Sequence, residues 1–220
     1  MITVLYIWTI PSRTIAFALL RMGLDRTLLR KSPGVVFAKT LGIGSGVRFT
    51  PGDADLHRWG FILSISEELF PAFDQSALVN RWRKRSLSEF RILLDPIASR
   101  GQWSKREPFE INPTISASGK IVAITRARIA WRENIKFWRA LPPVTQALHS
   151  SPGLIYAIGI GEAPLGLQGT FSLWESAEAL RDFAYKSPAH RQVIAETQRR
   201  NWYSEELFAR FSVREIHGEL

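Results

Sequence analysis

Residues 184–197, AYKSPAHRQVIAET, contain one of only four histidines in the chain. Ser187 followed by Pro188 is typical of a helix start, with an N-cap serine and a proline at the first helical position. His190 then shares an apolar helix face with Val193. The positive end of a helix favours a neutral imidazole, which is the form that binds a metal. The residues alone therefore predict either a metal ligand or a buried structural histidine at position 190.

Arginines and tryptophans are further candidates for binding. In the stretch TRARI, residues 125–129, strand alternation places Arg126 and Arg128 on one face. Two neighbouring arginines can bind carboxylates bidentately, although a solvent-facing strand edge would carry the same pattern. The chain has eight tryptophans, Trp174 among them. This aromatic content suits either a large apolar pocket or ordinary core packing.

Two glycine-rich stretches and the cysteine count exclude several kinds of site. The stretches LGIGSG and IGIGEAPLG have neither the GxGxxG fingerprint that opens a helix nor the Gly-Lys-Ser/Thr of a phosphate loop, so no nucleotide site is predicted. The chain has no cysteine. This excludes disulfides, zinc–thiolate sites, iron–sulfur clusters and a thiolate-ligated haem.

The charge of the chain predicts an anionic partner. The 220 residues carry a formal net charge of +9, which attracts anionic membrane surfaces, acidic partners or nucleic acid. No zinc-finger, RRM or KH signature is present, so nucleic acid is not expected. The densest basic stretch, residues 81–91, is expected to be a solvated helix face. The apolar start, MITVLYIWTI, predicts a buried strand and is a poor signal peptide, so we expect a cytoplasmic protein, peripheral on the inner membrane if it binds lipid.

The chain contains an internal repeat. KSPGVVFAKTLGIGSG, from Lys31, and SSPGLIYAIGIGEAPLG, from Ser150, share Ser-Pro-Gly, an apolar run and a glycine-rich loop. The serines at 32 and 151 are 119 positions apart. The same offset aligns TVLYIWTIP with the strand-like residues 122–130, and the helical residues 15–29 with 134–148. After the loop the offset falls to 109, because Gly60 matches Gly169.

Each copy shows the order β-α-β-β-α-β, which is the ferredoxin-like pattern. We therefore predict an α+β fold in which two ferredoxin-like repeats pair into one barrel, with an interior large enough for a ligand. The first repeat covers residues 1–98, with its second helix at 77–94. A Pro-, Gly- and Ser-rich linker covers 99–120, and the second repeat, which carries the ligand candidates, covers 121–220.

Six motifs resemble the spheroidene monooxygenases, the bacterial carotenoid 2-ketolases of the dimeric α+β barrel superfamily. The resemblance covers most of the chain and is densest after Ser99. The motifs are SRGQWSKREPF (99–109), TRARI (125–129), FWRALPPV (137–144), GIGEAPLGLQGTFSLWES (159–176), FAYKSPAHRQVI (183–194) and WYSEELFARF (202–211).

This resemblance implies a haem-dependent monooxygenase (cofactor heme, iron protoporphyrin IX) that uses O2 and electrons from a ferredoxin. The implied substrate is an acyclic carotenoid of the spheroidene type, converted at C2 to a ketone by two successive hydroxylations. His190 would be the iron ligand, Arg126 and Arg128 would hold the haem propionates, and Trp174 would line the polyene tunnel. A haem-binding or haem-degrading barrel without carotenoid activity is the alternative, and a cofactor-free barrel with an apolar ligand is a second one.

Overall fold

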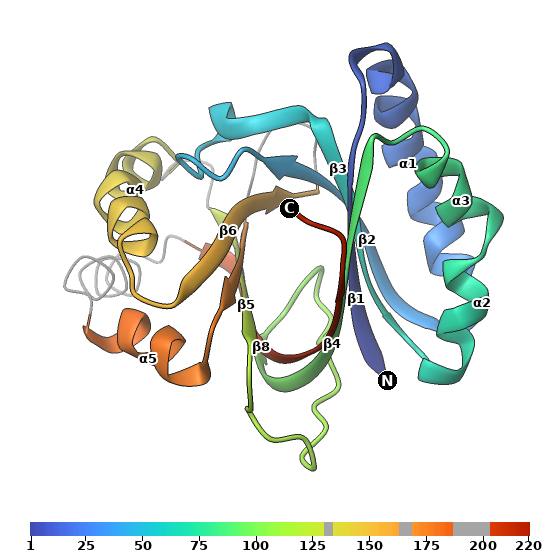
Figure 1. The fold of residues 1–220 in the computed structure, drawn as a ribbon. Coiled ribbons are helices and arrows are strands. Elements are labelled where there is room, and N and C mark those ends of the chain that lie inside the picture. The colour runs from blue at the N-terminus through green and yellow to red at the C-terminus, as the bar shows by residue number, and fades with distance from the viewer. Residues whose placement is uncertain (130–133, 163–168, 187–202) are drawn as a thin grey trace.

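The computed structural model describes residues 1–129, 134–162, 169–186 and 203–220. Its eight strands are all paired antiparallel and close into one barrel, with the helices outside (Figure 1). Around the barrel their order is β1-β3-β2-β6-β7-β5-β8-β4. The strands are β1 Ile2–Thr9, β2 Val35–Gly44, β3 Ala54–Ile65, β4 Ser88–Gly101, β5 Ile121–Ile129, β6 Leu154–Gly161, β7 Gly169–Trp174 and β8 Tyr203–His217.

The two predicted repeats are present, and they form the α+β barrel that the sequence indicates. The first copy contributes β1 to β4 and the second β5 to β8, and the copies meet where β2 pairs with β6 and β4 with β8. Three helices cover the first copy and two described helices lie on the side of the second (Figure 1). They are α1 Ile15–Lys31, α2 Phe70–Asp74, α3 Ala77–Arg83, α4 Asn134–His149 and α5 Ala177–Lys186.

Side chains fill the barrel interior, which corrects the expectation of a ligand-sized cavity there. Strand alternation points one residue in two inward, and the inward set forms one continuous buried apolar cluster of large side chains. An eight-stranded barrel is just wide enough for side chains to fill it. The cluster includes Leu5, Ile62, Ile92, Ile124, Ile158, Phe171 and Phe211.

The helix predicted at 77–94 is wrong beyond its first two turns. Helix α3 ends at Arg83, and residues 88–101 form strand β4. Phe90 and Ile92 are buried toward the barrel interior, while Arg91 between them points outward to ion pairs with Asp74 and Glu215. The basic stretch 81–91 is therefore a helix end, a turn and a strand start, and not one solvated helix face.

Aromatic side chains fill the layer between the first copy's helices and its sheet. Trp8 stacks on Tyr6 and Trp82, with ring centroids 5.2 and 5.4 Å away, and meets Phe61 edge-on at 4.9 Å. All four residues are buried. We call this filled space the first layer, and its rings make the stacked and edge-on contacts that aromatic side chains favour in protein cores.

The segment between the copies folds into the barrel. Strand β4 runs three residues into the predicted linker 99–120 and ends at Gly101, where φ is +93° and a Cβ atom would lie 2.2 Å from the Glu206 carbonyl oxygen. Glycine is therefore required there. Trp103 and Phe109 of this segment are buried in the interior cluster. Among the described helices, none combines the length and hydropathy needed to cross a membrane.

Candidate functional site

Small side chains cover the outer face of the second copy's sheet. Because Ile124, Phe171 and Ile158 point into the barrel, their chain neighbours point outward toward the helices. The strand registers align these neighbours in two rows across β5, β7 and β6, one of Ala123, Ser172 and Ala157 and one of Thr125, Thr170 and Gly159. We call these six residues, together with Ala127, the next outward residue along β5, the cradle.

The repeat shows how unusual this composition is. At the offset of 119 positions Tyr6 matches Thr125 and Trp8 matches Ala127, and at the offset of 109 Phe61 matches Thr170. The three strand aromatics of the first layer thus each have a small counterpart in the cradle. The first-copy aromatics would each bury about 150–250 Å2. At these strand positions the second copy therefore places less side-chain volume between its sheet and its helices than the first copy does.

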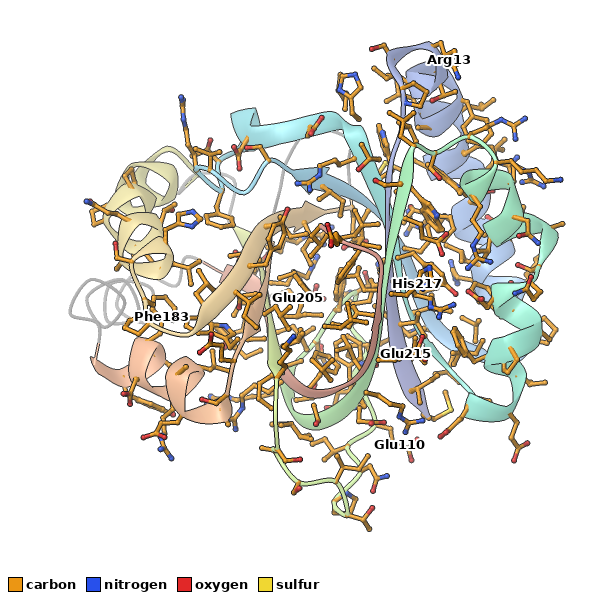
Figure 2. The ribbon with its side chains drawn as sticks, in the orientation of Figure 1. Arg13, Glu110, Phe183, Glu205, Glu215 and His217 are labelled. Atoms are coloured by element: carbon orange, nitrogen blue, oxygen red, sulfur yellow. The ribbon has the colours of Figure 1, made fainter. Side chains whose placement is uncertain are left out.

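Trp174 closes one end of the cradle. It is fully buried on the outward face and its indole nitrogen donates to the Ser172 hydroxyl at 2.9 Å. Helix α5 packs over it through Phe183, whose ring centroid lies 5.4 Å away (Figure 2). Leu148 of α4 belongs to the same apolar cluster. The helical layer is therefore anchored at this end, beside the row formed by Ala123, Ser172 and Ala157.

Arg126 lies on the opposite face of the same sheet, inside the barrel. It is buried, its guanidinium pairs with Glu205 and with Glu162 at 3.0 Å, and it lies 5.4 Å from the Trp103 ring centre. Glu162 also accepts hydrogen bonds from the Trp103 indole at 2.6 Å and from the Lys39 ammonium at 2.5 Å. Figure 2 shows Glu205 within the barrel. We call these five residues the barrel network.

The network keeps its carboxylates charged. Burial opposes ionisation of Glu162, but hydrogen bonds from Lys39 and Trp103 and the charge of Arg126 hold its pKa below the ordinary value. Burial likewise opposes ionisation of Glu205, yet the backbone N–H groups of Lys105 and Ser104, together with Arg126, lower its pKa. Burial lowers the pKa of Lys39 although Glu162 partly compensates. The network therefore ties the inter-copy segment to β2, β5, β8 and the end of β6.

The structure separates the residues that the sequence singled out. Arg126 and Arg128 share one strand face as predicted, but Arg126 is buried among carboxylates while Arg128 is exposed. Trp174 is on the other face of the sheet. His190 lies outside the described residues, four positions after the last residue of α5, Lys186. In the described part of the chain, no group of three or more His, Asp or Glu residues is placed to hold a metal.

Sequence reasoning missed two features. The cradle does have a signal in the repeat, since aligning Tyr6 with Thr125 shows the change in side-chain size. The carboxylate partners of Arg126 had no local signal, because Glu162 and Glu205 are 36 and 79 positions away in the chain.

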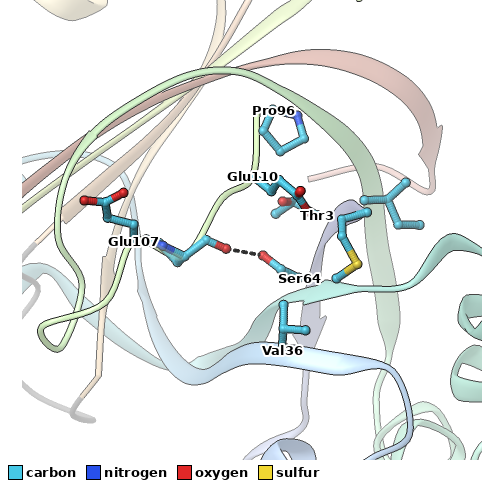
Figure 3. Close-up of a pocket in the computed structure, with 9 residues that line it drawn as sticks. Thr3, Val36, Ser64, Pro96, Glu107 and Glu110 are labelled. Atoms are coloured by element: carbon cyan, nitrogen blue, oxygen red, sulfur yellow. Dashed lines mark hydrogen bonds between the residues drawn. The ribbon is translucent and has the colours of Figure 1, made fainter. Parts of the chain in front are cut away.

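A separate small cavity lies between the first copy and the inter-copy segment (Figure 3). It has a volume of about 160 Å3 and is lined by Thr3, Val36, Ser64 and Glu110, among others. The Ser64 hydroxyl donates to the Pro108 carbonyl at 2.8 Å. The Thr3 hydroxyl is buried and has no hydrogen-bond partner among the described residues. Of the residues singled out from the sequence, those that the structure describes do not line this cavity.

Known proteins resemble the chain over most of its length. Spheroidene monooxygenase of Rhodobacter capsulatus is 32% identical over 203 residues, which cover 90% of this chain and 83% of that protein. The enzyme of the same name from Rubrivivax gelatinosus is 31% identical over 84% of this chain and 72% of its own length. The Cereibacter sphaeroides enzyme is 31% identical over 82% of this chain, but the match spans only 56% of that protein. No protein-family model matches the sequence.

Solved structures share the fold. A crystal structure of aldoxime dehydratase superposes with a TM-score of 0.59 at 12% identity, covering 97% of this chain and 81% of the other. A second aldoxime dehydratase, in complex with butyraldoxime, gives 0.58 at 10% identity, covering 97% and 79%. These likenesses support the α+β barrel alone. The two relatives that this chain matches over more than two thirds of their length decide the relationship: the chain belongs to the spheroidene monooxygenase family.

Proposed function

We propose that this protein is a haem-dependent monooxygenase that inserts O2-derived oxygen at C2 of an acyclic carotenoid and yields a 2-keto product. The main structural support for this proposal is the cradle, with its small outward-facing side chains. Family membership supports monooxygenase chemistry, because the relatives are named for it. Spheroidene, in those names, is the substrate of those proteins, and a spheroidene-like polyene is what we propose here.

The cradle fits a large planar apolar group. Three adjacent strands span about 10 Å, a width suited to a porphyrin ring. Along them the outward side chains are small, with Thr125, Thr170 and Gly159 forming one row. The hydroxyls of Thr125, Thr170 and Ser172 are the few polar side-chain groups on an otherwise apolar surface, as is usual for cofactor sites.

His190 is the proposed iron ligand. The sequence predicts that it lies on an apolar helix face shortly after α5, and α5 packs on Trp174 at the end of the cradle. The first copy has no histidine in its equivalent helix, residues 77–83, so a ligand here would belong to one copy only. Trp174 would form a wall of the site.

Arg128 is the better of the two propionate candidates. Like Arg126 it lies on the face of β5 opposite the cradle, but its side chain is exposed near the end of the strand, so a propionate would have to reach it around that end. Arg126 would have to leave Glu162 and Glu205 to reach a propionate, and a buried ion pair is costly to break. We propose that Arg126 instead holds the inter-copy segment against the sheet beneath the cradle.

Bound haem would supply the activation of O2, with electrons from a ferredoxin-type donor. The chain's own contribution is placement and exclusion of water. The apolar cradle surface and the α5 contacts would hold a flat ligand in one orientation, and a low-dielectric layer would keep solvent away from the reacting carbon. No described side chain needs to act as an acid or base in this scheme.

Hemin titration followed by absorption spectroscopy tests the proposal. We expect a Soret band in wild type, and its loss in Thr125→Tyr/Thr170→Phe, which restores the first-copy residues. Thr125→Ser/Thr170→Ser is the matched control and should still bind. His190→Ala tests the ligand separately: an unchanged band would sink that assignment while keeping the haem.

The substrate is tested on the loaded protein. Reductant, ferredoxin, O2 and spheroidene should give a ketocarotenoid while the Soret band survives turnover. Loss of the band with tetrapyrrole products, and no ketocarotenoid, would support haem degradation instead. If wild type binds no hemin, the haem proposal fails and a barrel that binds an apolar ligand becomes the better interpretation.

A further inference from the structure

Helix α1 exposes a stripe of leucines. Leu20, Leu24 and Leu28 are 62, 50 and 44% exposed. Spaced four residues apart, they lie on one face of the helix. The opposite face is buried against the sheet through Met22 and Leu29, among others. The helix is therefore apolar on both sides, whereas a helix of a globular protein normally presents polar groups to solvent.

Helix α3 lies beside this stripe and is basic. The Phe17 and Trp82 rings join the two helices with centroids 5.4 Å apart, and the Arg85 guanidinium lies 4.5 Å from the Phe17 ring centre. Arg81, Lys84 and Arg85 line a groove along the outer side of α3. The stripe is thus bordered by cations on this side.

Cations also occur along α1 itself and are not balanced by acids. Arg26, Arg30 and Lys31 are exposed. The only acidic residue of α1 is Asp25, which is completely buried and paired with Arg21 and with Arg81 of α3. Helix α3 has no acidic residue. An apolar stripe with cations on both sides and no exposed carboxylate of its own is typical of helices that lie in a lipid interface.

We propose that the outer surface of α1 and α3 docks the protein onto an anionic lipid bilayer. The leucines would enter the boundary between headgroups and acyl chains, and the arginines and lysines would pair with lipid phosphates. Docking of a second copy of this chain on the same surface is less favourable, because it would bring two sets of unbalanced cations together.

This docking surface lies on the first copy, on the far side of the barrel from α4 and α5 (Figure 1). The inference therefore does not rest on haem or on the cradle. Variants of the leucine stripe should lose lipid binding and keep hemin binding, while cradle variants should do the opposite. Failure of one proposal leaves the other standing.

Co-sedimentation with vesicles tests the surface. Wild type should bind phosphatidylcholine vesicles that contain about 30% phosphatidylglycerol, and bind pure phosphatidylcholine vesicles much less, with the difference falling as salt rises. Leu20→Gln/Leu24→Gln/Leu28→Gln should weaken partitioning at least about tenfold, because three apolar side chains no longer enter the interface. Arg30→Glu/Lys84→Glu should remove the preference for the anionic vesicles.

The matched control removes three exposed apolar residues elsewhere. Leu56, Ile111 and Ile155 are 37, 44 and 42% exposed, and their change to Gln should leave vesicle binding unchanged. Equal binding by the leucine-stripe variant, or absence of wild-type binding to anionic vesicles, would overturn the proposal. The proposal would also fail if sedimentation analysis showed that wild type is a dimer and the leucine-stripe variant a monomer, while both bound vesicles equally.

Discussion

The two copies have the same strand order, but the side chains between sheet and helices are large in the first copy and small in the second. In the first layer Tyr6, Trp8 and Phe61 stack between helices and sheet. In the cradle their counterparts are Thr125, Ala127 and Thr170. One copy therefore uses its layer for stability, and the other gives up the same contacts. Because both copies share one barrel, the first can stabilise a fold in which the second carries small side chains at the equivalent positions.

The largest expected effect is on the stability of the first layer. Phe61→Ala would leave a cavity among Trp8, Trp82 and their neighbours, at a cost of about 3–5 kcal/mol of unfolding free energy. Thr170→Ala, at the matching cradle position, should cost less than about 1 kcal/mol. Urea unfolding measures both, and equal costs would remove the distinction between the two layers.

Removing a buried carboxylate of the first copy should also cost more unfolding free energy than removing an exposed one of the second copy. Asp25 is fully buried and accepts from the Trp82 indole at 2.8 Å, besides pairing with Arg21. Asp25→Ala would leave the Trp82 indole and the guanidinium groups of Arg21 and Arg81 without this partner, and we expect a loss of about 3 kcal/mol by chemical denaturation. Glu178→Ala, on α5 of the second copy, is the control and should change stability by less than about 0.5 kcal/mol.

A ligand bound in the cradle should stabilise the folded state and so partly replace the packing contacts that the small cradle side chains do not make. If hemin fills the cradle, a free concentration of 100 times the dissociation constant stabilises the folded state by about 2.7 kcal/mol. Thermal unfolding should show a higher Tm for wild type with hemin. The Thr125→Tyr/Thr170→Phe variant should show no such rise. A rise in that variant equal to that of wild type would place hemin somewhere other than the cradle.

The smallest effect concerns acid stability and the barrel network. The lowered pKa values of Glu162 and Glu205 mean that their stabilisation is complete above the ordinary glutamate pKa of about 4.3 and is lost as pH falls through the lowered values. Because Glu162 is partly exposed, its share is about 1 kcal/mol. Glu162→Gln should therefore lose less stability than wild type between pH 7 and about pH 3.

Glu175→Gln is the matched control for the acid experiment, since Glu175 is exposed on the same copy. It should follow wild type through the whole titration, with urea midpoints recorded at each pH. If Glu162→Gln also follows wild type, the network does not contribute to stability in the way its hydrogen bonds indicate.

The sequence predicted the fold well because the repeat reports on topology directly. An offset shared by strand, helix and loop implies the same unit twice, and two such units close a barrel. The error at 77–94 arose because Leu78, Val79 and Trp82 follow a helical period and the basic residues after them carry no clear stop signal. The alternation that marks β4 begins only at Phe90.

The site was less predictable for a physical reason. Strand alternation paired Arg126 with Arg128 on one face, but a local pattern does not say whether that face looks into the barrel or toward the helices. It also says nothing about Glu162 and Glu205, which reach Arg126 only once the barrel is closed.

The pairing of β4 with β8 has a consequence for synthesis on the ribosome. The register joins Arg91 to His217 and Gly101 to Leu207, so more than 100 residues separate the partners. When the first copy emerges, its edge strand β4 has no neighbour on one side and must wait until the last strand of the second copy has been translated. Such non-local closure makes folding slow, and an open edge during that interval can pair with other chains. Folding yield in the cell should therefore depend more on the translation of residues 203–217 and on chaperone protection of β4 than on either layer of helices.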